Sequence, residues 1–254
     1  MEYFGKDIID DFINEVREEK SKIKKIIGVY GGRFQPFGPH HKKVYQWLKS
    51  KFDDAYITTS NIKKLPRHPM NFNEKVRHMT KMGIPSSKIV MERSPFVAKN
   101  LMSKFDPETT AVVYIFGKKD TGRLGGGKYF QDFKRNKNNL KGHEEHGYYL
   151  VAPHMSVSAG GLEVSGTSMR NLLGSPKYKD QREKLFKKMF GYYDKGLFNM
   201  MTNKFSKLFE SKELHEGMKD KLRWVFKSIK KEAGQTKKLA QLLKKYVKQG
   251  AKLT

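Results

Sequence analysis

Short apolar runs alternate with segments of helical periodicity between residues 24 and 151 of the chain. Five runs rich in β-branched and aromatic residues are predicted strands: residues 24–30, 54–60, 88–91, 111–116 and 148–151. Apolar positions three and four apart predict helices over residues 41–52 and 73–83. Strands that alternate with helices form a parallel sheet covered on both faces. We therefore predict an α/β fold, a Rossmann-like sheet whose ligands bind beyond the carboxyl ends of the strands.

Three segments fall outside this alternation. Residues 6–22 carry an apolar stripe, which predicts an amphipathic helix within an N-terminal element spanning residues 1–23. The polar segment from Asp120 to Gly147 is rich in Gly, Lys and Asn, and we expect it to form a mobile loop over the site. After Pro176 the chain becomes Lys-rich with helical apolar spacing. The pattern thus predicts a domain over residues 24–175, followed by a basic helical region over residues 176–254.

The charge balance adds a second feature to this basic region. The chain has 52 Lys and Arg against 26 Asp and Glu, a formal net charge of +26 at pH 7. Residues 176–254 contain 22 of the basic and 8 of the acidic residues, which gives 22 − 8 = +14. Such a surface attracts polyanions. Two interpretations follow: the region contacts nucleic acid or an acidic protein, or it is a solvated surface that binds neither.

Composition also excludes several classes of protein. The chain has no cysteine, so disulfides, thiolate metal sites and thiol nucleophiles are excluded. The longest uninterrupted apolar stretch, residues 111–116, is far too short to span a bilayer. The first residues include neither a basic segment nor an apolar segment of the kind found in secretory signals. We expect a cytoplasmic protein with no membrane partner.

A glycine-rich turn follows the first predicted strand. It reads Gly31-Gly32-Arg33-Phe34-Gln35-Pro36-Phe37-Gly38-Pro39-His40-His41 and leads into a predicted helix. Glycines after a strand let backbone N–H groups approach a triphosphate, and the N-terminus of the next helix attracts its negative charge. A histidine at that position can hydrogen-bond the α-phosphate and stabilise the charge of a transition state. The turn therefore predicts a site for a nucleoside triphosphate.

This turn resembles the first motif of the HxGH nucleotidyltransferase superfamily, Gly-x-Phe-x-Pro-x-(His/Thr)-x-Gly-His. Its opening residues are similar to those of nicotinamide mononucleotide adenylyltransferases and their phage-encoded relatives. The resemblance implies that Gly32, Arg33 and Phe34 bind the nucleotide and that His41 is catalytic. The chain departs from the motif in one respect, because Gly38 replaces the first His or Thr and His40 replaces the glycine. We consider His40 a substitute for the missing side chain; the alternative is that both histidines only cap the helix.

A second motif lies about 130 residues further along the chain, at Val164-Ser165-Gly166-Thr167-Ser168-Met169-Arg170. Alone, such a sequence is an ordinary capped helix start, in which Ser165 and Thr167 are candidate caps. Its position after the fifth strand resembles the second motif of the same superfamily. The resemblance implies that Ser165, Thr167 and Ser168 lie near the β- and γ-phosphates. It also implies that Arg170 neutralises the departing pyrophosphate.

Four weaker patterns accompany these two motifs. Gly117 and Asp120, after the fourth strand, resemble the superfamily's Gly-x-x-Asp stretch on the base and ribose side; the alternative is an ordinary turn. Residues 71–77 resemble a helix start near the acceptor. Residues 122–129 nearly spell a P-loop but end in tyrosine, which lacks the hydroxyl position that binds magnesium. Residues 143–146, His-Glu-Glu-His, lack the spacing of a zinc site, so no metal-binding side chains are predicted.

By resemblance, the predicted function is transfer of AMP from ATP to a phosphorylated acceptor, nicotinamide mononucleotide, with Mg²⁺ as cofactor and release of pyrophosphate. The sequence leaves two alternatives open. One is a cytidylyltransferase that acts on a phosphorylated alcohol. The other is a nucleotide-binding or structural protein with weak catalysis, which contacts nucleic acid or an acidic partner through residues 176–254.

Overall fold

The computed structural model describes residues 23–65, 67–117, 129–159 and 162–209. Three predictions lie outside these residues: the helix over residues 6–22, the placement of Asp120 and the fold of the basic region beyond residue 209. None of the helices in the described ranges combines the length and apolar character that a membrane crossing requires.

Six parallel strands form the central sheet, in the order β3-β2-β1-β4-β6-β5. They are β1 (Lys25–Gly31), β2 (Asp54–Thr59), β3 (Ile89–Met91), β4 (Thr110–Phe116), β5 (Phe130–Asp132) and β6 (Gly147–Val151). The five predicted strands are thus confirmed, as is the Rossmann-like class. The strand order reverses between β1 and β4, so the carboxyl ends of these two strands are where a ligand of such a sheet binds.

The strand β5 was not predicted. It lies in the segment expected to be a loop, and this expectation is wrong for residues 130–132. Phe130–Asp132 pair with β6, and Phe133 and Leu140 are buried. Phe133 packs its ring 6.0 Å from Phe52, measured between centroids. The Lys and Asn residues between Phe133 and Leu140 make the segment polar on average, which concealed the edge strand.

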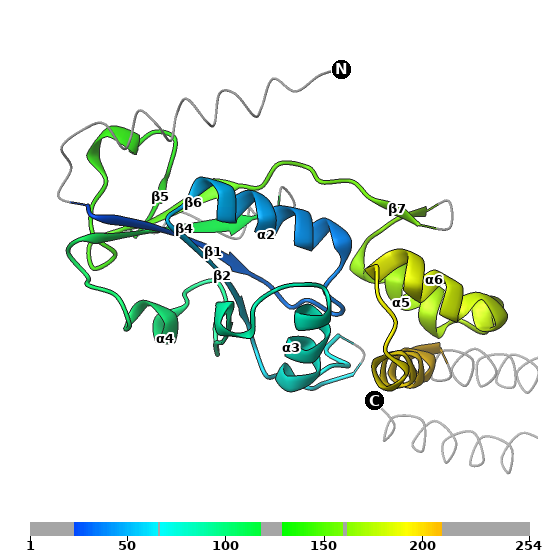
Figure 1. Cartoon of the computed structure of the whole chain (residues 1–254). Coiled ribbons are helices and arrows are strands. Elements are labelled where there is room, and N and C mark those ends of the chain that lie inside the picture. The colour runs from blue at the N-terminus through cyan, green and yellow to red at the C-terminus, as the bar shows by residue number, and fades with distance from the viewer. Residues whose placement is uncertain (1–22, 66, 118–128, 160–161, 210–254) are drawn as a thin grey trace, which may run out of the picture. The chain divides into compact units, whose positions relative to one another are not determined.

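Helices cover both faces of the sheet (Figure 1). The helix α2 (Pro39–Lys51) lies on the face where Gly28 closely approaches Leu48 and Phe52. The short helix α4 (Lys99–Met102) packs on the opposite face, against Ile27 and Val29. The remaining α-helices are α3 (Phe72–Lys81), α5 (Gly166–Gly174) and α6 (Arg182–Phe190). The 3-10 helices are Ser86–Lys88, Lys137–Asn139 and Pro176–Gln181. The short strands β7 (Ser158–Ala159) and β8 (Leu162–Glu163) pair with each other in a separate sheet.

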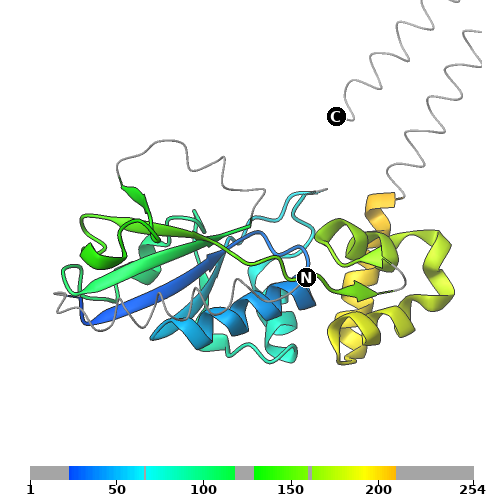
Figure 2. The same cartoon turned by 90° about the horizontal axis from the view of Figure 1, so that it is seen from above.

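The chain after β6 passes to the end of the sheet where β1 leads into α2, and there forms α5 and α6 (Figure 2). Residues 195–209 are also helical. The compact unit that contains the sheet extends through Ser206, so the change in composition at Pro176 falls inside it. Within this unit the backbone of Phe205 lies so close to Gly174 that a Cβ there would be 2.6 Å from its carbonyl carbon. Residues between 176 and 206 are therefore packed beside α5.

Candidate active site

The turn after β1 is shaped by two glycines. A Cβ on Gly31 would lie 2.6 Å from the carbonyl oxygen of Pro95, and a Cβ on Gly32 would lie 2.7 Å from the ring of Phe34. Phe34 has a positive φ of 46°, a conformation that costs a bulky residue on the order of 1–3 kcal/mol. The glycines therefore make room for neighbouring backbone and for one ring. The sequence alone suggested only that they admit a phosphate.

Phe34 lies in an aromatic cluster with Tyr30, Phe37 and His41. Its ring centroid is 5.2 Å from that of Tyr30, 5.4 Å from Phe37 and 5.1 Å from His41. Phe34 and Phe37 are buried. Both rings contact the His41 imidazole, so Phe34 packs against the histidine.

His41 has a defined tautomer. Its Nδ1 accepts a hydrogen bond from the Gly38 backbone N–H at 2.8 Å, which closes the first turn of α2. Burial, and then the neighbouring His40 and His78, hold the pKa of His41 well below its usual range, so the ring is neutral at pH 7. A neutral imidazole that accepts at Nδ1 carries its proton on Nε2. The cap considered from sequence is therefore present, and it leaves one N–H of His41 available to a phosphate oxygen.

His40 occupies the space beside Gly38. A Cβ on Gly38 would lie 2.8 Å from Cε1 and 2.9 Å from Nδ1 of His40. The two histidine rings are 3.8 Å apart between centroids. Nδ1 of His40 is buried and has no hydrogen-bond partner among the described residues. The side chain of residue 40 thus fills the volume that a side chain at residue 38 would need.

The second motif forms the start of α5, as predicted. Ser165 is the N-cap, with its hydroxyl accepting from the Ser168 N–H at 3.1 Å, and the Ser168 hydroxyl accepts in turn from the Ser165 N–H at 2.7 Å. Thr167 does not cap; its hydroxyl accepts from Nη2 of Arg170 at 3.2 Å. Nη1 of Arg170 donates to the Gln35 carbonyl oxygen at 2.6 Å, a contact between residues 135 positions apart. Arg170 therefore joins the two motifs.

Positive charge gathers around this junction. Burial, and then the neighbouring Arg33, lower the pKa of Arg170. The pKa of His68 is lowered by burial and then by Arg33, Lys75 and Arg67. Arg33 and Arg170 therefore form a small cationic group at the junction of the two motifs. Such a group is stabilised by a bound polyanion.

Lys75 was not identified from sequence as a site residue. It is buried, and its Nζ donates to the Thr59 hydroxyl at 2.7 Å and to the Ser60 carbonyl oxygen, at the carboxyl end of β2. Burial lowers its pKa to about 8. Residues 71–77 were predicted as a helix start, and Asn71 is indeed the N-cap of α3. The burial of Lys75, by contrast, depends on β2 and could not be inferred from its neighbours.

Two further predicted positions can be placed. Gly117 directly follows β4 and is exposed, whereas Asp120 lies outside the described residues. Nε2 of His143 lies 3.3 Å from the Phe105 carbonyl oxygen. Within the described part of the chain, no three His, Asp or Glu side chains are grouped so as to hold a metal ion.

The lowered pKa values of the buried histidines predict that the stability of the fold depends on pH. Burial lowers the pKa of His40 to about 4, and Glu163 raises it only in part. As the pH falls, this histidine is protonated first in the unfolded chain, where its pKa is near 6.5. The free energy of unfolding is therefore highest above about pH 6.5 and decreases as the pH falls towards 4. The slope approaches about 1.4 kcal/mol per pH unit for each such histidine. Urea unfolding between pH 7 and pH 5 should show a shallower slope for His40→Asn than for the wild type.

These features define an α/β protein in which two motifs meet beyond the carboxyl end of β1, where Arg170 donates to Gln35. A family model described as cytidylyltransferase-like matches residues 29–170, which include both motifs and more than half of the chain. The chain belongs to this cytidylyltransferase-like family, and its resemblance to the HxGH nucleotidyltransferase superfamily is confirmed.

Solved structures of similar fold include two enzymes at low sequence identity. One is a bifunctional NMN adenylyltransferase/ADP ribose pyrophosphatase from Francisella tularensis, 14% identical, covering 78% of this chain and 56% of that chain, with a TM-score of 0.44. The other is the nicotinic acid mononucleotide adenylyltransferase of Plasmodium falciparum complexed with NaAD, 13% identical, covering 70% of this chain and 95% of that chain, with a TM-score of 0.43. A comparison with curated protein sequences found no significant match.

Proposed function

We propose that this protein transfers AMP from ATP to nicotinamide mononucleotide and releases pyrophosphate. The observation that carries the proposal is the hydrogen bond from Arg170 to the Gln35 carbonyl oxygen. It joins a helix start rich in hydroxyl and N–H groups to the turn that contains His40 and His41. An adenylyltransferase needs both parts, one for the leaving pyrophosphate and one for the α-phosphate.

The reaction is a direct in-line displacement. A phosphate oxygen of the acceptor forms a bond to the α-phosphorus of ATP, the bond from that phosphorus to the bridging oxygen breaks, and pyrophosphate leaves with both electrons. The chain supplies position and charge. The Nε2–H of His41 donates to an α-phosphate oxygen. Arg170 has five N–H donors, and those that Gln35 and Thr167 do not occupy contact the β- and γ-phosphates.

Mg²⁺ enters this proposal as part of the ATP complex. It prefers oxygen ligands and commonly binds through substrate phosphates and water, with only one or two carboxylates. The described residues of the site supply histidines, hydroxyl groups and cations, which suit the phosphates. Mg²⁺ would offset negative charge on the triphosphate, and the side chains would orient it.

The choice of acceptor rests on the resemblance of residues 32–37 to nicotinamide mononucleotide adenylyltransferases. The test is incubation with ATP, Mg²⁺ and nicotinamide mononucleotide, with pyrophosphate and NAD measured over time. Both products should appear in equal amounts. Binding of ATP without formation of either product would contradict the choice of acceptor.

A cytidylyltransferase remains the second candidate, because the matching family model carries that description. The nucleoside triphosphates can be compared in a thermal-shift assay with Mg²⁺. ATP should raise the unfolding temperature more than CTP, GTP or UTP at equal concentration, since the ligand that binds the folded state more tightly stabilises it more. A larger shift with CTP would favour transfer of CMP.

A further inference from the structure

The segment that follows α6 binds the helix α3 at several points. One of them is a buried relay through His78. The Tyr192 hydroxyl lies 2.6 Å from Nδ1 of His78, and Nε2 of His78 lies 2.7 Å from the Phe37 carbonyl oxygen. A carbonyl oxygen can only accept, so Nε2 carries the proton; Nδ1 of the neutral ring then accepts from the Tyr192 hydroxyl. Tyr192 is thereby connected, through His78, to Phe37 of the first motif.

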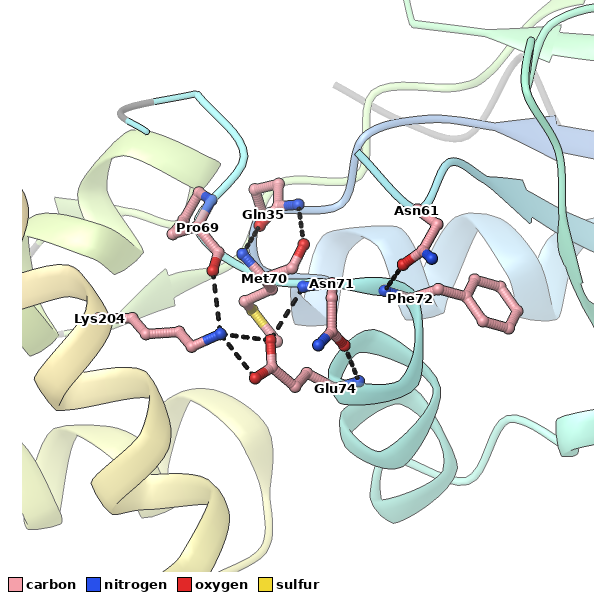
Figure 3. A network of polar contacts seen from close by, with 8 residues as sticks. All are labelled: Gln35, Asn61, Pro69, Met70, Asn71, Phe72, Glu74 and Lys204. Atoms are coloured by element: carbon pink, nitrogen blue, oxygen red, sulfur yellow. Dashed lines mark hydrogen bonds and ion pairs between the residues drawn. The ribbon is translucent and has the colours of Figure 1, made fainter. Parts of the chain in front are cut away.

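A second connection runs through Lys204 (Figure 3). Nζ of Lys204 donates to Oε1 of Glu74 at 2.6 Å and to the Pro69 carbonyl oxygen at 3.1 Å. The same Glu74 carboxylate accepts from the Asn71 N–H at 2.9 Å, and the Asn71 side chain accepts from the Glu74 N–H at 3.0 Å. Lys204 therefore fixes the carboxylate that completes the cap of α3.

The residue before this cap is bound to the first motif. The Gln35 side-chain amide donates to the Met70 carbonyl oxygen at 2.8 Å and accepts from the Met70 N–H at 2.9 Å (Figure 3). The Gln35 backbone carbonyl accepts from Arg170. Lys204 therefore contacts the cap of α3 at Glu74. The residue next to this cap in the chain, Met70, is hydrogen-bonded to Gln35, which in turn accepts from Arg170.

We propose that residues 192–204 are a positioning element of the active site, in which Tyr192 and Lys204 act through α3 to hold the first-motif turn in its ATP-binding geometry. The inference rests on the proposed function only in taking that turn as the ATP site. Both connections end on that turn, one at Phe37 and one at Gln35. Neither residue touches the reacting atoms.

The degree of burial separates these contacts from ordinary surface pairs. The Lys204 and Glu74 side chains are 21% and 24% exposed, and His78 is fully buried. The pair Lys187–Glu183 in α6 has a similar length of 2.7 Å, but both side chains are 52% exposed. Exposed pairs contribute little because water and salt screen them. Lys187→Met is therefore a matched control for Lys204→Met.

The experiment uses the full chain and three measurements. The first is hydrogen exchange at the Asn71 and Glu74 amides, with the amides of β4 as an internal reference. The second is ATP affinity, measured by calorimetry with Mg²⁺. The third is kcat and KM for ATP in the transfer reaction. Lys204→Met and Tyr192→Phe should each weaken ATP binding about tenfold, since small errors of position are costly at such sites. Lys204→Met should also accelerate exchange at both amides, and Lys204→Arg should restore both properties.

The outcomes distinguish this inference from the choice of acceptor. If the wild type forms no NAD, the acceptor is wrong, yet exchange and ATP affinity still test the positioning element. If Lys204→Met and Tyr192→Phe bind ATP as tightly as Lys187→Met, the proposal is overturned. Should Lys204→Met fail to fold, Lys204→Gln and Tyr192→Phe provide the same comparison. A lower unfolding temperature with unchanged ATP affinity would show a merely structural role, and so would also overturn it.

Discussion

Replacing His41 by alanine should lower kcat for AMP transfer by about 10²–10³-fold, the usual cost of losing one donor to a transition-state oxyanion. The neutral ring of His41 presents its proton at Nε2 because Nδ1 accepts from Gly38. Removing the ring removes the donor and also the cap on the first turn of α2. The rate of pyrophosphate release at saturating ATP and acceptor measures the effect.

His41→Gln separates these two roles. A glutamine at the third helical position can accept from the N-cap N–H, as in a capping box, so this variant should recover stability. It should remain slow, because the amide neither fills the ring's place in the aromatic cluster nor presents a donor at the same point. Recovery of both stability and rate in His41→Gln would show that His41 only caps α2.

Exchanging residues 38 and 40 should reveal whether His40 replaces the missing first histidine. His40→Gly alone should lower kcat by about 10²-fold, since a donor to the phosphate is lost. Gly38→His alone places a Cβ 2.7 Å from the end of Met169 and 2.8 Å from the His40 ring. Such overpacking costs about 1–3 kcal/mol of stability. The unfolding free energy in urea checks this single variant.

The double variant Gly38→His/His40→Gly should recover most of the rate lost in His40→Gly. It removes the clash with the His40 ring, and the remaining contact is with the flexible end of Met169. Gly38 has extended backbone angles (φ −120°, ψ 171°), which a histidine adopts without strain. A double variant no faster than His40→Gly would mean that His40 does not act in place of the first histidine.

The sheet was predictable because each of its inner strands is a compact apolar run. The strand β4 is buried at every residue, and the uninterrupted apolar run over residues 111–116 predicted this strand. The strand β5 was missed because an edge strand three residues long carries too little periodicity, and its one aromatic residue is followed by two polar residues. The caps at Asn71 and Ser165 were local signals, since capping depends on residues three positions apart.

Several features of the site depend on contacts between distant segments. The burial of Lys75 requires the carboxyl end of β2, and the pair Lys204–Glu74 joins residues 130 positions apart. Nothing adjacent to these residues in the chain distinguishes them from exposed lysines. The cationic group around Arg170 was likewise spread along the chain as ordinary basic residues.

The sequence by itself determined the family, five of the six strands of the main sheet and the identity of the two motifs, because these depend on short runs of residues. The tertiary structure decided how the motifs meet, through the hydrogen bond from Arg170 to Gln35. It also decided where His40 lies. The glycine at residue 38 leaves a space that the His40 ring and the end of the Met169 side chain border in the folded chain.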